Sequence, residues 1–254
     1  MKLTSLSLLL IASLLLGCGG GNSNSSSSTT PSATPGAAQG VYSGTTSTGT
    51  AFSTIVLPND SIWVLYGTST PSIFYVAGMM TGQGASKSGS YTANLQDFYW
   101  TGATYTASVT ATYVPGASMN GSVTEGGGVG TYTFSGAPLA SSNYNYSAPA
   151  SLSAVSGTWR GTLLDGTSAI LTISTSGTLT GSNLGCSFTG KVAPDSSGKN
   201  LFAVSLTFGG SPCVLPGQTA SGIGITYLLA NGVTRQLVFG GTSGSNGTVF
   251  MATR

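Results

Sequence analysis

The sequence contains no histidine, and only 5% of its 254 residues are charged. Without histidine, the Ser-His-Asp and Cys-His arrangements of nucleophilic catalysis and most zinc or iron sites are excluded. The formal net charge of +2 provides no basic surface that would attract nucleic acid or anionic lipid. We therefore expect no nucleic-acid partner, no metal site and no cofactor.

Long helical periods are also lacking beyond residue 17. The chain instead has 39 glycines, 40% hydrophobic residues and 9% aromatic residues, with Thr, Ser, Val and Tyr prominent. β-Branched and aromatic side chains suit a pleated sheet, and glycine suits tight turns. This composition predicts an all-β protein.

The N-terminal segment is the exception to this pattern. Lys2 supplies a positive charge, and the apolar run from Leu6 to Leu16 is too short to cross a hydrocarbon core of about 30 Å as a helix. These features are typical of a signal peptide over residues 1–17. A tract rich in Gly, Ser, Asn, Thr and Pro follows, and it predicts a flexible tether over residues 18–38.

The signal peptide leads into Leu15-Leu16-Gly17-Cys18, which resembles the lipobox of bacterial lipoproteins. The resemblance implies that Cys18 becomes the first residue of the mature chain and carries acyl chains such as palmitate. Two or more acyl chains anchor a protein stably, so the membrane is an expected partner through this lipid. Gly19 replaces the aspartate that usually retains such proteins in the inner membrane, which implies the outer membrane, on either its surface or its periplasmic face. The alternative is an ordinary secretory signal with an incidental cysteine.

Beyond the tether, short runs of β-forming residues alternate with Gly, Pro, Asn and Asp. This pattern predicts two tandem antiparallel β-barrel or sandwich domains, over residues 39–137 and 155–254, joined by a linker at 138–154. A membrane-spanning barrel is an alternative, although many of the runs are shorter than the roughly ten residues that such strands need. The expected strands are 41–45, 52–57, 62–67, 73–80, 90–97, 105–114, 119–124, 131–134, 158–164, 168–174, 201–208, 224–229, 235–239 and 248–254.

The two units resemble each other in sequence, which indicates an internal repeat. GVYSGT at 40–45 matches GTWRGT at 157–162. Residues 91–98 would then correspond to 202–208, and the later glycines and phenylalanines would correspond in order. Coincidence between two β-rich halves is the alternative. The two later pairs are Gly121 with Gly222 and Phe134 with Phe239.

Turn dipeptides predict two hairpins in the second unit. Asp165-Gly166 and Asn231-Gly232 tolerate the positive φ angles of two-residue turns. We therefore expect 158–164 to pair with 168–174, and 224–229 to pair with 235–239.

Two cysteines are left once Cys18 is assigned to lipidation. Cys186 and Cys213 are an even pair in an exported chain, which favours a disulfide. Closing that loop would stabilise the fold by roughly 3 to 4 kcal/mol. A metal site is the alternative, but the chain offers neither a histidine nor a second cysteine pair to complete it.

Five acidic residues are the candidates for acid–base chemistry. Asp60, Asp165 and Asp195 lie in expected turns, where a short carboxylate ordinarily bonds its own backbone. Asp97 and Glu125 are the pair that a carboxylate-based hydrolase would use. A cleft that holds both would be the sign of such an enzyme.

Aromatic side chains are candidates for ligand contact, because exposed rings stack on sugars and form hot spots at protein interfaces. In the run Phe98-Tyr99-Trp100, strand alternation directs at least one ring away from the core. The alternative is that the rings fill the cores or the interface between the two units. The candidate residues are Trp63, Tyr66, Phe98, Tyr99 and Trp100.

The lipobox, the Ser-rich tether and the two β units together resemble two-lobed β-barrel surface lipoproteins of Gram-negative bacteria, such as those that bind factor H or transferrin. The repeat starts and the segment 210–217 also resemble uncharacterised proteobacterial lipoproteins. We therefore expect a non-enzymatic, lipid-anchored envelope protein that binds a protein or glycan ligand. A structural envelope protein without a dedicated ligand is the first alternative, and a carboxylate-based hydrolase is the second.

Overall fold

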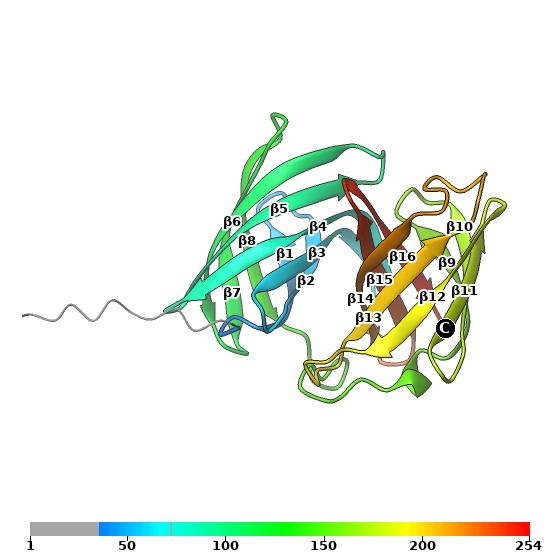
Figure 1. Cartoon of the computed structure of the whole chain (residues 1–254). Coiled ribbons are helices and arrows are strands. Elements are labelled where there is room, and N and C mark those ends of the chain that lie inside the picture. Colours follow the sequence, from blue (N-terminus) through cyan, green and yellow to red (C-terminus); the bar gives the residue numbers. More distant parts are fainter. Residues whose placement is uncertain (1–35, 72) are drawn as a thin grey trace, which may run out of the picture. The chain divides into compact units, whose positions relative to one another are not determined.

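The computed structural model describes residues 36–71 and 73–254, which form two closed antiparallel β-barrels of eight strands each (Figure 1). The prediction of an all-β protein with two tandem barrel or sandwich domains is therefore confirmed, and both domains are barrels. The expected signal peptide, Cys18 and the tether up to residue 35 lie outside the described residues. Within the described part of the chain, no helix is long and apolar enough to cross a membrane.

In the first barrel, each strand pairs with the next one along the chain, and β8 pairs back with β1. Closure leaves no unpaired strand edge, which removes a common route to aggregation. The strands are β1 (Gly40–Thr46), β2 (Ala51–Val56), β3 (Ser61–Ser69), β4 (Phe74–Lys87), β5 (Ser90–Tyr99), β6 (Thr104–Val114), β7 (Ser118–Glu125) and β8 (Gly130–Pro138).

The second barrel has the same order of pairing, and β16 closes on β9. A short 3₁₀ helix, η1 (Leu152–Ala154), precedes it. The strands are β9 (Gly157–Leu163), β10 (Ser168–Ile173), β11 (Thr178–Asn183), β12 (Cys186–Pro194), β13 (Phe202–Phe208), β14 (Thr219–Leu228), β15 (Arg235–Ser243) and β16 (Asn246–Thr253).

Both expected hairpins of the second barrel are present. β9 pairs with β10 around Asp165-Gly166, and β14 pairs with β15 around Asn231-Gly232. β11 was not expected from the sequence, because Gly181 in its centre lacks a side chain that favours a strand. The ring of Phe188 fills this space, since a Cβ on Gly181 would lie 2.3 Å from it. Packing across the sheet therefore overrides the weak local preference.

The matching motif at 40–45 and 157–162 marks the seam where each barrel closes. Tyr42 and Trp159 are both 1% exposed, and each donates a hydrogen bond to the carbonyl four residues earlier. Gly44 and Gly161 lie against the last strand of their barrels. A Cβ on either residue would come within 1.8 Å of a backbone oxygen of β8 or β16. The repeated sequence motif thus forms the same closing contact in both barrels.

Farther along the chain, the expected correspondence slips by one strand. Residues 91–98 and 202–208 do lie on the fifth strands of the two barrels. Gly121 lies on the seventh strand, however, whereas Gly222 lies on the sixth strand of its barrel. Phe134 and Phe239 differ in the same way. The error arises because turn lengths differ between the copies and glycine recurs on many strands.

One end of the first barrel is closed by the residues that precede β1. Asp60, in the β2–β3 turn, accepts hydrogen bonds from the backbone N–H of Gly36 at 3.0 Å and that of Ser86 at 3.2 Å. Ala38 is fully buried beneath these contacts. Residues 36–38, which composition assigned to the tether, are therefore part of the barrel. The prediction that the Asp60 carboxylate bonds its own turn is therefore wrong, because it links segments that are distant in the sequence. Asp165 and Asp195 do bond their own turns, as expected.

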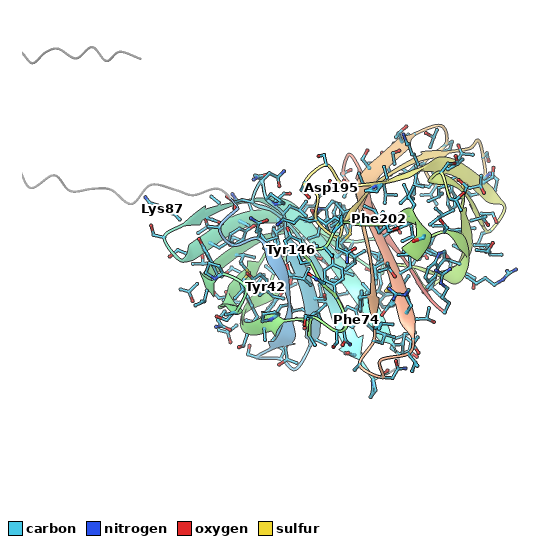
Figure 2. The ribbon with its side chains drawn as sticks, turned by 90° about the horizontal axis from the view of Figure 1, so that it is seen from below. Tyr42, Phe74, Lys87, Tyr146, Asp195 and Phe202 are labelled. Carbon is cyan, nitrogen blue, oxygen red and sulfur yellow. A yellow bond between two sulfur atoms is a disulfide. The ribbon has the colours of Figure 1, made fainter. Side chains whose placement is uncertain are left out.

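The outer faces of the two barrels share an apolar contact within one compact unit of the chain. Its centre combines Met79 and Phe98 of the first barrel with Val238 and Val249 of the second, all at most 4% exposed. The linker also touches both barrels. Asn143 donates to the carbonyl of Leu228 at 3.1 Å. The hydroxyl of Tyr146, which is labelled in Figure 2, donates to the carbonyl of Val56 at 3.3 Å.

Candidate functional site

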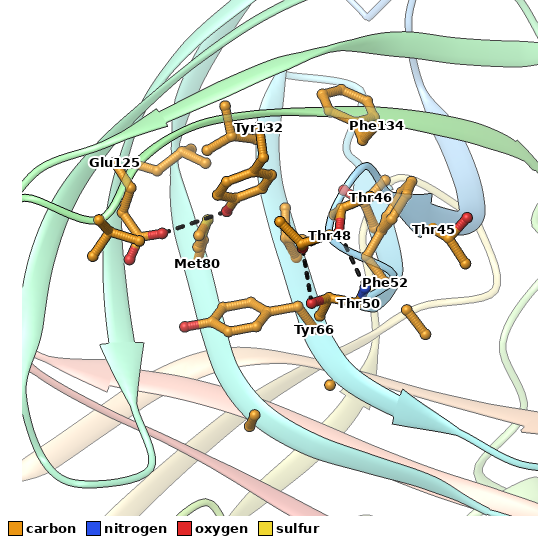
Figure 3. A pocket seen from close by; sticks show the side chains of 18 of the residues that line it. Thr45, Thr46, Thr48, Thr50, Phe52, Tyr66, Met80, Glu125, Tyr132 and Phe134 are labelled. Carbon is orange, nitrogen blue, oxygen red and sulfur yellow. Dashed lines mark hydrogen bonds between the residues drawn. The ribbon is translucent and has the colours of Figure 1, made fainter.

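The first barrel encloses a cavity of about 990 Å³, to which all eight of its strands contribute (Figure 3). This volume lies within the range of about 300–1,000 Å³ that is typical of small-molecule sites. An eight-stranded barrel is just wide enough either to be filled by side chains or to hold one small ligand. The interior of the first barrel is left partly open.

The interior of the second barrel is filled instead. Its core cluster contains the rings of Trp159, Phe188, Phe202, Phe239 and Phe250, each at most 6% exposed. The first barrel also directs aromatic rings inward, among them Tyr42, Tyr91 and Tyr113, yet it leaves the cavity open between its walls. The two copies of one architecture thus differ in what occupies their interiors.

The cavity opens toward one set of turns. Residues of the β1–β2, β5–β6 and β7–β8 turns and the end of β3 line it, whereas the turns at the opposite end do not. We call the lining turn residues the rim. Rim side chains are largely threonine, and those of the β1–β2 turn bond one another, Thr46 to Thr48 at 2.8 Å and Thr48 to Thr50 at 3.2 Å.

The deeper wall of the cavity is apolar. Strand alternation directs these side chains inward, as on β6, where Val109 is 4% exposed and its neighbours on the strand are exposed. Such a wall favours an apolar group of a ligand. It consists of Ile62, Val64, Met80, Leu95, Val109, Met119 and Val123.

Two acidic residues meet near the rim. Asp97 pairs with Tyr105 of β6, and Glu125 pairs with Ala107 two residues farther along the same strand. The two carboxyl groups therefore approach each other across β6, where the small side chain of Ala107 leaves room. Asp97 is 0% exposed and Glu125 is 7% exposed.

The environment of Asp97 favours its neutral form. Burial, followed by a hydrogen bond with Glu125, raises the pKa of Asp97 to about 7, against an ordinary value of 3.8. The Tyr66 hydroxyl opposes this shift by donating to both oxygens of Asp97, at 2.8 and 3.0 Å. Burial and then the charge of Asp97 raise the pKa of Tyr66 above its ordinary value. Tyr66 therefore stays a donor at neutral pH.

Glu125 faces the cavity with one oxygen unpartnered. Its Oε2 lies 3.5 Å from the Tyr132 hydroxyl, a long contact on the wall shown in Figure 3. Its Oε1 is buried and has no hydrogen-bond partner in the described part of the chain. Burial and then the charge of Glu125 raise the pKa of Tyr132. The site therefore presents more acceptors than donors.

No cation of the first barrel balances these acids. Lys87 is the only Lys or Arg between residues 36 and 138, and it is exposed beside the β4–β5 turn, at the end away from the rim (Figure 2). The residues that the structure describes also contain no group of three or more metal-ligating side chains. The acid pair is thus an isolated negative site.

The five candidate aromatic residues separate into three places. Tyr66 and Tyr99 line the cavity, with their ring centroids 6.0 Å apart. Trp63 and Phe98 pack in the contact between the barrels, which is the alternative that the sequence left open. Trp100 is 53% exposed on the β5–β6 turn.

Cys186 and Cys213 form a disulfide, as their number predicts.

Sequence reasoning did not identify Tyr105 and Tyr132 as cavity residues. Asp97 and Glu125 were singled out, but as a hydrolase pair. Their inward direction was available from strand alternation, because each lies two residues after an inward apolar residue, Leu95 or Val123. An acid in phase with an apolar face is the signal that would have placed both in the interior.

No protein-family model matches this chain, and no curated protein matches it. Two solved structures are similar to it. One is a Bacteroides fragilis protein provisionally described as an outer membrane protein, 13% identical, with a TM-score of 0.29, covering 85% of this chain and 98% of that one. The other is a Nostoc punctiforme protein of unknown function from the DUF3598 family, 12% identical, with a TM-score of 0.27, covering 85% and 94%. At these TM-scores neither structure supports a functional argument.

Proposed function

We propose that this protein is a non-enzymatic, lipid-anchored envelope protein whose first barrel binds a small molecule or a small moiety of a larger partner. The cavity of about 990 Å³ carries the proposal, because a barrel interior that serves stability alone is filled, as in the second barrel. The threonine rim and apolar wall are typical of a pocket that admits an amphipathic ligand through one end.

A cavity-filling substitution tests the proposal. Pyrene is a suitable probe, because its fluorescence reports an apolar environment and it has no polar group. Val109→Trp places an indole in the cavity and is expected to abolish pyrene binding. Val114→Trp is the matched control on the same strand, because Val114 is 56% exposed and outside the cavity. Equal pyrene binding by the two variants would show that the cavity is not the site.

The location of the protein in the cell envelope is proposed from Leu15-Leu16-Gly17-Cys18. Cys18→Ala should release the protein from membranes, and fractionation of cells that produce it measures this. Protease treatment of intact and lysed cells then distinguishes the two faces of the outer membrane. Loss from intact cells places the barrels at the surface, and survival until lysis places them in the periplasm. A Cys18→Ala variant that still sediments with membranes would refute the lipid anchor.

Hydrolysis is the second candidate, because one site holds Asp97 with Glu125. One feature weighs against it. Asp97 is fully buried, and the Tyr66 hydroxyl holds both of its oxygens, so substrate has no access to this carboxylate. We therefore assign the pair to binding.

A further inference from the structure

The unpartnered oxygen of Glu125 indicates what the cavity binds. A buried carboxylate oxygen without a donor is costly, and buried polar groups in proteins are nearly always paired. Glu125 is only 7% exposed, it lines the cavity, and its Oε1 has no hydrogen-bond partner among the described residues. A ligand that brings a hydrogen-bond donor to this oxygen removes the deficit.

The charge of the acid pair favours one kind of hydrogen-bond donor on the ligand. When both are ionised, Asp97 and Glu125 carry two negative charges, and the one cation on this barrel lies at its other end. Two neighbouring carboxyl groups cannot both ionise readily without an opposite charge nearby. An ammonium group supplies that charge and three donors, whereas a hydroxyl supplies one donor and no charge.

Aromatic rings also line the cavity that Glu125 faces. The ring of Tyr99 lies 6.0 Å from that of Tyr66 and 6.5 Å from that of Tyr105, between centroids, and all three residues line the cavity. Ring faces attract cations within about 6 Å. The apolar wall continues below the rings and is suited to a hydrocarbon chain or ring system.

We propose that the cavity of the first barrel binds an apolar molecule that carries a protonated amine, with the ammonium group on Glu125 and the apolar part against the inner wall. This inference rests on the proposed function. Asp97 serves as a positioning residue for Glu125. A bare divalent cation fits less well, because calcium takes six to eight oxygen ligands and magnesium needs octahedral geometry, and only two carboxylates are present here.

Displacement of pyrene by three decyl compounds tests the inference at pH 8. Decylamine, decanol and decanoate share one chain and differ in the head group. We expect decylamine to displace pyrene at concentrations at least about tenfold lower than decanol, because a hydrogen bond to a charged group contributes about 1.5–3 kcal/mol. Decanoate should displace it least well. In Glu125→Gln, the preference for the amine should vanish while displacement by decanol stays unchanged.

Asp165→Asn is the control for charge, because it removes one negative charge from an exposed turn of the second barrel. It should keep the wild-type preference. Displacement by decanol shows that Glu125→Gln still folds with an open cavity. Equal displacement by amine and alcohol in the wild type, or an undiminished amine preference in Glu125→Gln, would overturn the inference and leave the proposed function standing. Failure of pyrene and all three compounds to bind would overturn both.

Discussion

Asp97 is the residue at which the chemistry of the cavity affects stability. Burial and the hydrogen bond with Glu125 raise its pKa to about 7, so the folded protein holds a proton that the unfolded chain, with a pKa near 3.8, releases. The folded state therefore binds more protons between these two values. The free energy of unfolding accordingly decreases as pH rises from about 4 through 7.

Asp97→Asn should remove this dependence on pH. The amide cannot ionise, and it still accepts a hydrogen bond from Tyr66. At about 1.4 kcal/mol per unit of pKa, the loss in the wild type amounts to at most about 4 kcal/mol. Thermal unfolding at pH 5 and pH 8 measures it. We expect the wild-type melting temperature to fall between these values and that of Asp97→Asn to fall less.

Asp165→Asn again serves as the control, because its carboxylate lies in an exposed turn. It should show the wild-type dependence on pH. If Asp97→Asn and the wild type lose stability equally between pH 5 and pH 8, the carboxyl group of Asp97 does not hold the proton. The groups that face this carboxyl from the surrounding strands are Tyr66 on β3, Tyr99 on β5, Tyr105 on β6, Glu125 on β7 and Tyr132 on β8.

At the scale of the element, the closing pair of strands depends on glycine. Gly44→Ala would bring a Cβ within 1.8 Å of the Ser135 carbonyl oxygen, so β1 and β8 would have to separate. We expect a loss of about 3 kcal/mol or more, in the range of severe core substitutions. Urea unfolding measures it. Gly210→Ala is the control, because a Cβ there meets nothing within 4 Å. Equal midpoints would refute the role of the seam.

Strand patterns also show how much of the fold the sequence could predict. On β6, hydroxyl residues alternate with buried ones, and the strand was located with nearly correct bounds. On β3, the run Ile62-Trp63-Val64-Leu65-Tyr66 has no alternation, because one face lines the cavity and the other packs between the barrels. Runs of this kind indicate burial on both faces. They could have identified the interface strands in advance.

The cavity itself was not predictable in the same way. Asp97 and Glu125 are 28 positions apart, and only the register across β6 brings them together. The space between the inward side chains depends on how far opposite walls stand from each other, which local pattern does not determine. The difference between an open first barrel and a filled second barrel is therefore a property of the folded structure.

At the scale of the whole molecule, the apolar contact couples the barrels, and Phe98 is its most informative residue. It is 3% exposed, and its ring lies against β16, where a Cβ on Gly247 would approach it to 2.7 Å. An apolar contact of this kind makes the two barrels unfold together. We therefore expect the wild type to show a single transition in calorimetry.

Phe98→Ala should cost about 3–5 kcal/mol, as large-to-small substitutions of buried aromatics do, and should split the calorimetric transition into two. Trp100→Ala is the matched control, because it removes a neighbouring ring that is 53% exposed, and surface changes usually alter stability by less than about 0.5 kcal/mol. A single transition in Phe98→Ala, at the temperature of Trp100→Ala, would mean that the contact does not join the barrels. Two transitions in Phe98→Ala alone would assign this ring to coupling between barrels rather than to ligand contact.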